Sequence, residues 1–140
     1  MAAEIAVAGR RLPVPAATVR RAVRSVLDGE GRSADISVTF LGRDRMRRLN
    51  REYLGHDRPT DVLAFTLDDP SGALLGDVYV CPWVARREAA QLGVPVRREI
   101  LRLVVHGTLH VLGYDHPEGA DRTDCAMWRL QEGYLEAVSR

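Results

Sequence analysis

The chain is organised around one stretch of eleven residues, 106–116, which reads HGTLHVLGYDH and holds three of the four histidines. In a helix, His106 and His110 share one face because residues four apart lie one above the other. On a straight helix, His116 would point about 100° away from them and lie about 9 Å farther along the axis. Gly113 stands where a helix can end in the left-handed conformation, so we expect the chain to turn back there. The stretch therefore predicts a helix, a turn and three imidazoles that meet.

Three neutral imidazoles without a fourth protein ligand are typical of a catalytic zinc site, whose open position holds a water with its pKa lowered to about 7. We therefore predict one Zn²⁺ per chain, bound by His106, His110 and His116. Imidazole also suits other divalent transition metals, so a different ion is an alternative. Asp115 and Asp61 are candidates to accept a hydrogen bond from the second ring nitrogen of a ligand. The structural alternative is that the histidines are ordinary core residues.

The same stretch nearly matches a protease motif. Metzincin proteases carry H-E-x-x-H-x-x-G-x-x-H, in which the glutamate is the general base. The histidines and the glycine match, but Gly107 occupies the glutamate position and cannot accept a proton. A metalloprotease-like hydrolase is therefore an alternative that lacks its usual base.

A closer resemblance covers most of residues 38–138. The stretch resembles the H-G-x-L-H-L-x-G-Y-D-H signature of the YbeY-type endoribonucleases, the ribosomal RNA maturation factors of bacteria, with Val111 in place of one leucine. The other matching blocks, in family order, are Leu49-Asn50, residues 53–65 (YLGHDRPTDVLAF), residues 75–78 (LGDV), Glu88-Ala89 and Met127-Trp128. Three further positions depart from the family pattern: Leu54 replaces an arginine, Ala64 a serine and Thr66 a proline.

The resemblance implies a zinc-dependent endoribonuclease specific for single strands. It also implies a role in ribosomal RNA maturation, at the 3′ end of the small-subunit 16S rRNA, and in ribosome quality control. The implied partners are single-stranded or ribosomal RNA, with small-subunit ribosomal proteins as further candidates. A second reading from the resemblance is a ribosome-associated metal-binding factor without catalysis.

The catalytic residues are left unassigned, because Leu54 stands where the family has an arginine thought to act in RNA cleavage. A guanidinium stabilises the extra charge of a phosphodiester in the transition state, and leucine cannot. Arg58, in the same loop, and Arg51, one helical turn earlier, are the candidates to replace it. The alternative is that both are ordinary exposed side chains, as we expect for the loop residue His56.

Length and composition agree with one domain spanning residues 1–140, large enough to bury a core. Charge is uneven: residues 10–51 hold eleven arginines against four acidic residues, which suits a polyanionic partner or simply solvated helix faces. No apolar run reaches the length of a membrane helix, and no signal-peptide core is present, so we expect a cytoplasmic protein without a membrane partner. Cys81 and Cys125 are expected to be buried free thiols.

Periodicity predicts an α+β fold, with about four strands in a mixed sheet and helices packed on it. We expect strands at 5–7, 36–41, 62–67 and 75–80, the last two forming an antiparallel hairpin. Helices are expected at 18–27, 43–53, 83–92, 97–112 and 123–138, with Gly29 and Gly31 ending the first. The helix at 97–112 is apolar on nearly all sides, which predicts a central buried helix that carries the metal ligands.

Overall fold

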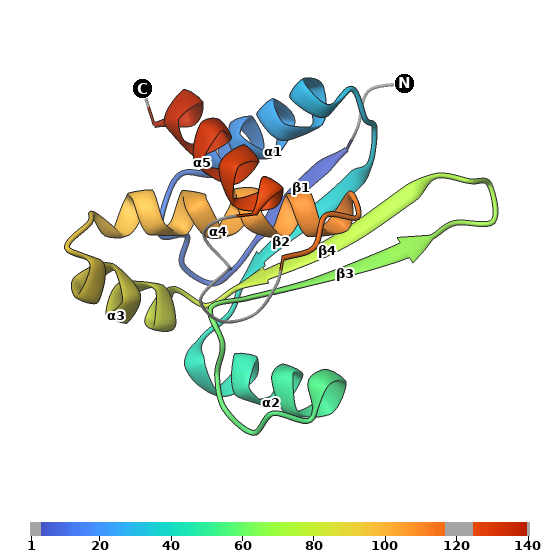
Figure 1. Cartoon of the computed structure of the whole chain (residues 1–140). Coiled ribbons are helices and arrows are strands. Elements are labelled where there is room, and N and C mark those ends of the chain that lie inside the picture. Colours follow the sequence, from blue (N-terminus) through green and yellow to red (C-terminus); the bar gives the residue numbers. More distant parts are fainter. Residues whose placement is uncertain (1–3, 117–124, 140) are drawn as a thin grey trace.

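The computed structural model describes residues 4–116 and 125–139, which form a sheet with helices on both of its faces (Figure 1). The elements in chain order are β1 Ile5–Ala8, α1 Ala16–Glu30, β2 Asp35–Phe40, α2 Arg43–Leu54, β3 Val62–Asp68, β4 Leu74–Val80, α3 Pro82–Leu92, α4 Val96–Val111 and α5 Ala126–Val138. The predicted α+β class and its order of elements are confirmed.

The sheet has four strands in the order β1-β2-β4-β3. β1 and β4 both run parallel to β2, whereas β3 pairs antiparallel with β4 as the predicted hairpin. The sheet is therefore mixed. In register, Val78 of β4 lies between Val38 of β2 and Ala64 of β3.

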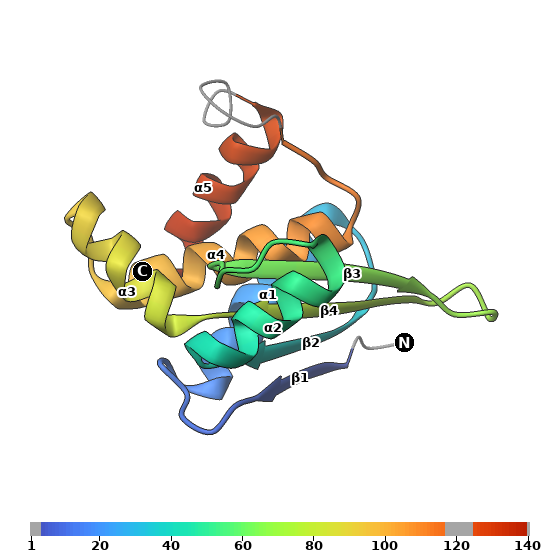
Figure 2. The same cartoon turned by 90° about the horizontal axis from the view of Figure 1, so that it is seen from below.

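The two faces of the sheet carry different layers. Helices α1, α4 and α5 cover one face, and α2 lies against the other (Figures 1 and 2). The larger apolar core joins α1, α4 and α5 to inward residues such as Val38 and Val78. A smaller cluster packs Met46 of α2 against Leu63 and Cys81. Each face of the sheet can carry its own apolar cluster because successive side chains of a strand point to opposite faces.

Helix α4 is buried on nearly all sides, as its sequence predicts: of residues 99–111, all but Arg102 and His110 are buried. Gly107 lets this helix approach the sheet closely, because a Cβ there would lie 2.5 Å from Cγ1 of Val78. The glutamate of the protease motif has no room at this position. The central helix is thus a rigid, tightly seated support.

Helix α1 differs from its sequence expectation at both ends. Helix α1 starts at Ala16 and continues through Gly29, so Gly29 does not end it; Gly31, with φ of 64°, is the cap. A Cβ at Gly29 would collide with the Tyr134 ring, which explains the glycine by packing rather than by helix termination. Tyr53, in the last turn of α2, is 63% exposed and packs its ring 5.2 Å from that of Phe65.

The last helix begins at Ala126, later than expected from the sequence, and the expected start at 123 lies outside the described residues. Neither cysteine is in a disulfide, as predicted; Cys81 is buried as expected, whereas Cys125 is only partly buried. Among the described residues, none of the helices is both long and apolar enough to cross a membrane.

Candidate metal centre

Three histidines converge at the end of α4. The Nε2 atoms of His106 and His110 lie 3.0 Å apart, and the His116 ring centroid is 5.1 Å from each of the other two. One ligand nitrogen from each ring can be chosen so that all three lie within 4.8 Å of one another. In a tetrahedral zinc site with Zn–N bonds of about 2.0–2.1 Å, the ligand atoms are about 3.3 Å apart. The donor set and its spacing therefore fit one zinc ion.

The turn that brings His116 back is built on Gly113. Its φ of 102° lies in the region that favours glycine. The Gly113 amide donates to the His110 carbonyl (3.0 Å), and the Tyr114 amide donates to that of Leu109 (3.1 Å). These bonds satisfy carbonyls at the helix end and reverse the chain, as the sequence predicts.

His106 is held by a residue that the sequence motifs do not reveal. Its Nδ1 lies 2.6 Å from Oε1 of Gln131 on α5, and Gln131 is only 1% exposed. Since the amide oxygen can only accept, Nδ1 carries the proton and Nε2 presents its lone pair to the other histidines. The available signal is the spacing of α5, where Gln131 falls between Met127 and Leu135 on the buried stripe.

The two carboxylates proposed from the sequence do not take this role. Asp115 Oδ1 is 3.8 Å from Nδ1 of His110, too far for a hydrogen bond, and its side chain is 95% exposed. Asp61 Oδ1 accepts from the amide of Val62 (2.7 Å) and the hydroxyl of Thr60 (3.3 Å), and so closes the turn before β3. Its negative charge nevertheless acts on His106 electrostatically.

Burial keeps the imidazoles of His106 and His110 neutral. Burial lowers the pKa of His106 to about 4, against the opposing effect of the Gln131 hydrogen bond. Burial, and then the neighbouring His116, lower the pKa of His110. A metal ligand must be the neutral imidazole, so both histidines are in the binding form at neutral pH.

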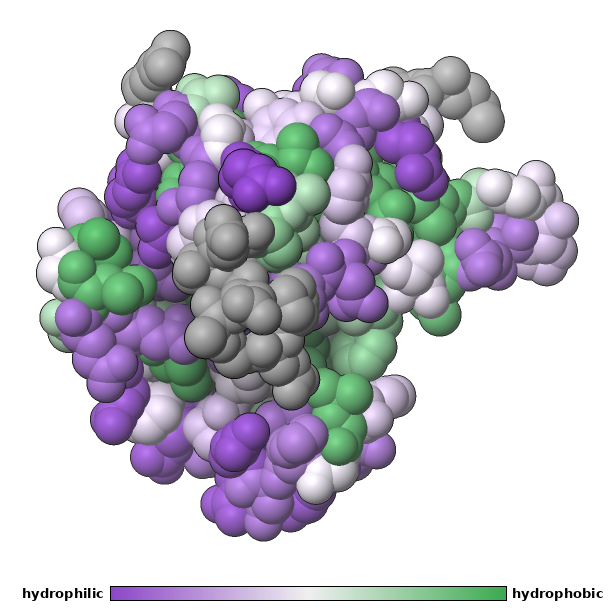
Figure 3. All heavy atoms as spheres, viewed as in Figure 1, coloured by the Kyte–Doolittle hydropathy of each residue, from purple (hydrophilic) through white to green (hydrophobic). Residues whose placement is uncertain are grey.

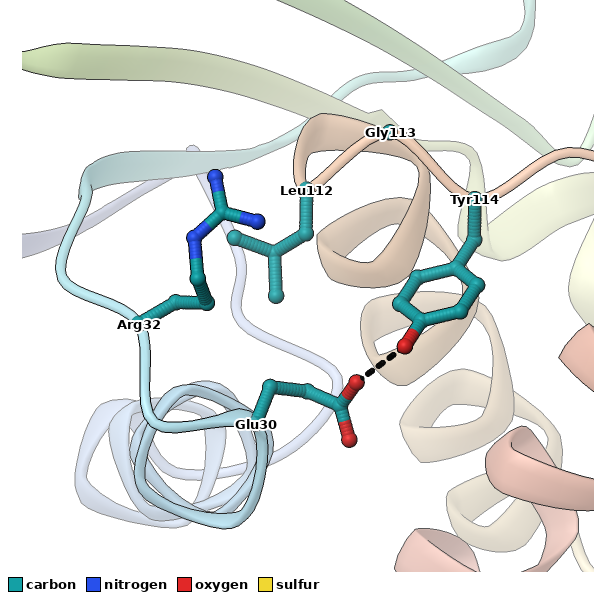
Figure 4. A pocket seen from close by; sticks show the side chains of 5 residues that line it. All are labelled: Glu30, Arg32, Leu112, Gly113 and Tyr114. Atoms are coloured by element: carbon teal, nitrogen blue, oxygen red, sulfur yellow. Dashed lines mark hydrogen bonds between the residues drawn. The ribbon is translucent and has the colours of Figure 1, made fainter.

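One carboxylate of α1 anchors both the turn and α5. Glu30 accepts hydrogen bonds from the hydroxyls of Tyr114, which lies in the turn, and Tyr134, three residues after Gln131. Figure 4 shows the first bond at the edge of a cavity of about 200 Å³, where Arg32 and Leu112 lie opposite. The Tyr114 bond, followed by that of Tyr134, lowers the pKa of Glu30. The carboxylate is thus ionised and ties α1 to the turn between His110 and His116 and to α5.

The loop between α2 and β3 is also ordered by side chains. Asn50, 3% exposed, donates to the carbonyl of Arg58 (2.9 Å), and Arg47 binds Asp57 with two hydrogen bonds (2.9 and 3.1 Å). Arg51 lies 3.6 Å from the same Asp57 carboxylate. Among the described residues, none pairs with the Arg58 side chain, which is exposed.

Two other residues of this segment lie at the surface. His56 is exposed, as expected, and does not belong to the histidine cluster. Leu54, at the end of α2, is 54% exposed.

Known proteins share this chain's sequence and fold. The family model described as Endoribonuclease YbeY matches residues 5–139. A protein named Endoribonuclease YbeY from Sulfurihydrogenibium sp. (strain YO3AOP1) is 46% identical over 110 residues, covering 76% of this chain and 72% of the relative. A protein of the same name from Parafrankia sp. (strain EAN1pec) is 44% identical over 114 residues, covering 73% and 70%.

The fold is similar to the solution structure of TM1509 from Thermotoga maritima, with a TM-score of 0.68 and 28% identity over 96% of this chain and 88% of that one. These matches confirm the resemblance carried by the sequence motifs. The chain belongs to the YbeY endoribonuclease family.

Proposed function

We propose that the protein is a zinc-dependent endoribonuclease that cleaves single-stranded RNA in the cytoplasm. Its proposed role is the maturation of ribosomal RNA, at the 3′ end of the small-subunit 16S rRNA, and ribosome quality control. The observation that carries the chemical part is the convergence of the imidazoles of His106, His110 and His116. Family membership supports RNA as the substrate.

The zinc ion, when bound, supplies Lewis acidity that stabilises developing charge and activates water. The three histidines would hold it, and Gln131 fixes the tautomer of His106 by accepting a hydrogen bond from its Nδ1–H. This support comes from buried positions on α4 and α5, so little reorganisation accompanies the reaction.

Arg58 is the candidate to contact the scissile phosphate. Its backbone is fixed by Asn50, and its side chain has no partner among the described residues, whereas Arg51 lies close to Asp57. The loop that carries Arg58 ends at Asp61, whose charge reaches His106. A guanidinium there would bind the phosphodiester through charge-assisted hydrogen bonds.

The exposed face of α2 is the candidate surface for the RNA backbone. It carries the exposed arginines Arg43, Arg45, Arg47, Arg48 and Arg51. The lower part of the molecule in Figure 3, where α2 lies in Figure 1, is largely hydrophilic. Positive side chains along one face suit phosphates, and single strands are favoured because their backbone and bases can be splayed into a site.

The experiment tests which substrate is cleaved and whether cleavage requires the metal. Zinc-loaded protein, purified without a histidine tag, is incubated with labelled single-stranded RNA, double-stranded RNA or casein, each with and without chelator. We expect cleavage of single-stranded RNA alone, abolished by chelator. Cleavage of casein would favour the protease alternative, which the close packing at Gly107 disfavours. Intact RNA would favour the metal-binding factor without catalysis.

The biological role needs a separate measurement. In a strain that lacks the gene, we expect small-subunit rRNA with unprocessed 3′ ends to accumulate. Normal 16S rRNA ends in that strain would contradict the maturation role while leaving the enzymatic proposal standing.

A further inference from the structure

The side-chain amide of Gln131 determines which nitrogen of His106 can bind the metal. Its Oε1 lies 2.6 Å from Nδ1 of His106. In this orientation Nδ1 carries the proton and Nε2 keeps its lone pair. If the amide were turned over, its NH2 group would face Nδ1, the proton would have to sit on Nε2, and the metal-binding lone pair would be lost. The orientation of one buried amide therefore controls whether His106 can act as a ligand.

The two neighbouring histidines do not select this orientation by themselves. The Nε2 atoms of His106 and His110 lie 3.0 Å apart, and a ring nitrogen can either donate or accept. This contact is satisfied in both tautomers of His106, provided that His110 takes the opposite role. The oxygen and the nitrogen of a carboxamide are also nearly equal in size, so packing distinguishes them poorly. The selection must come from the other side of the Gln131 amide.

A carboxylate of the same helix lies on that other side. Nε2 of Gln131 donates to Oε2 of Glu132 (3.1 Å). A carboxylate only accepts hydrogen bonds, so a turned-over amide would lose this bond and place its oxygen against a negatively charged oxygen. Glu132 thus stabilises the one orientation of Gln131 in which Oε1 faces His106.

Arg102 on α4 holds this carboxylate in place. Its Nε and Nη2 atoms donate to the two oxygens of Glu132 (both 3.1 Å), an arrangement that fixes the plane of the carboxylate. Its Nη1 atom donates to Glu99 (2.6 Å), whose side chain is only 4% exposed. The guanidinium carbon also lies 5.9 Å from the ring centroid of Trp128. The group that orients Gln131 is therefore anchored by a mostly buried arginine.

We propose that Glu132 and Arg102 are positioning residues for the metal ligand His106. The hydrogen bonds run from Arg102 to Glu132 and Gln131 on α5 and return to His106, one turn after Arg102 on α4. A hydrogen-bond partner that orients a histidine ligand raises metal affinity, and this circuit orients that partner in turn. The inference rests on the proposed function, because it concerns the metal site of that same enzyme.

The first test determines the tautomer of His106 without metal. In metal-free protein with isotope-labelled histidine, the ring-nitrogen chemical shifts distinguish the two tautomers, and a His106→Gln variant assigns the signals. We expect the proton on Nδ1 alone in the native sequence. Glu132→Gln keeps the length of a side chain that is 29% exposed, so the fold should tolerate it. An amide at this position can offer its oxygen or its NH2 group to Gln131, so both tautomers should be populated.

A second variant tests the arginine. Arg102→Lys keeps the positive charge beside Glu99 and Glu132 but loses the two-bond contact that fixes the carboxylate. We expect the tautomer of His106 to change in the same direction as in Glu132→Gln and by a smaller amount. An unchanged tautomer in Arg102→Lys would overturn the role of Arg102.

Zinc affinity, measured by competition with a chromogenic chelator, is the second readout. We expect Glu132→Gln to bind zinc about 3- to 10-fold more weakly, a smaller loss than for a direct partner of a ligand because the Gln131 amide can still present its oxygen. In a Gln131→Glu background the side chain presents an oxygen in either orientation, so Glu132→Gln should have no further effect. Glu136→Gln is the matched control, because Glu136 also pairs α5 with α4, through Arg98; it should leave affinity and tautomer unchanged.

The outcomes separate this proposal from its alternatives. A proton that stays on Nδ1 alone in Glu132→Gln would overturn it. An equal loss of affinity in Glu136→Gln would also overturn it, by assigning the effect to the docking of α5, as would an equal loss in the Gln131→Glu background. Failure of the proposed function looks different: the native sequence would not bind zinc, while the tautomer of His106 would still change in Glu132→Gln.

Discussion

Helices α4 and α2 lie on opposite faces of the same sheet and differ in almost every property. α4 is buried between the sheet, α1 and α5 and carries His106 and His110. α2 buries only Met46 and Asn50 and exposes its arginines to solvent. A buried helix holds metal ligands in fixed positions, whereas an exposed basic helix attracts a polyanion without fixing it. Metal binding and RNA binding should therefore respond to different substitutions.

The largest expected effect lies on the α2 side. Arg58→Ala should reduce the rate of RNA cleavage by about 10²–10³, the usual loss when a transition-state charge contact is removed. Zinc content and the unfolding midpoint should be unchanged, because the Asn50 bond goes to the backbone of Arg58. Arg51→Ala is the matched comparison, and we expect a smaller loss. Full activity in both variants would mean that neither arginine replaces the missing guanidinium; a gain in Leu54→Arg would then indicate weakened catalysis.

On the α4 side, the free energy of unfolding of the metal-free protein should decrease in acid. The pKa of His106 is about 4 in the folded, metal-free protein and near the ordinary histidine value of 6.5 when unfolded. Between these pH values the unfolded chain binds more protons than the folded chain. The stability that neutral His106 contributes is therefore fully present above pH 6.5 and is lost as the pH falls to about 4. His106 alone accounts for about 3 kcal/mol of that loss. Urea unfolding of metal-free protein at several pH values measures it, and His106→Gln should flatten the profile; an equally steep profile in that variant would assign the loss to other groups.

Substitutions at Gln131 test whether its hydrogen bond from α5 strengthens metal binding at His106. Gln131→Leu removes the acceptor for Nδ1 of His106 and should weaken zinc binding by about 10- to 100-fold. Gln131→Glu keeps an acceptor at the same place and should retain the affinity. Competition with a chromogenic chelator provides the affinities. Equal affinities in all three proteins would show that the hydrogen bond does not orient the ligand.

Two glycines test how closely α4 is seated on the sheet. Gly107→Ala should destabilise the protein by about 1–3 kcal/mol, because the added methyl group meets Val78. Gly133→Ala, in α5 with nothing within 4 Å of the added Cβ, should stabilise by about 0.5–1 kcal/mol through helix propensity. Thermal unfolding of the two variants gives both signs. A neutral Gly107→Ala would mean that α4 can shift away from the sheet at little cost.

The sequence alone predicted the parts of the molecule that depend on local pattern. Local patterns include the i, i+4 histidines, the glycine at the turn and the apolar periodicity of α4. They were enough to predict the buried helix and the histidine cluster. The supporting contacts depend on how helices pack. Gln131 reaches His106 across a sequence separation of 25 residues, whereas Asp61 and Asp115 are candidates on their position in the sequence alone. Gly29 was interpreted as a helix end because its packing against Tyr134 was not visible locally.

Metal content tests the central claim most directly. The protein is purified without a histidine tag, and zinc and other divalent metals are measured by elemental analysis alongside a His110→Ala variant. We expect close to one zinc per chain in the native sequence and a large loss in the variant, since a three-histidine site without one ligand binds weakly. A content below about 0.2 metal ions per chain that is unchanged in His110→Ala would contradict the assignment of this cluster as a metal site.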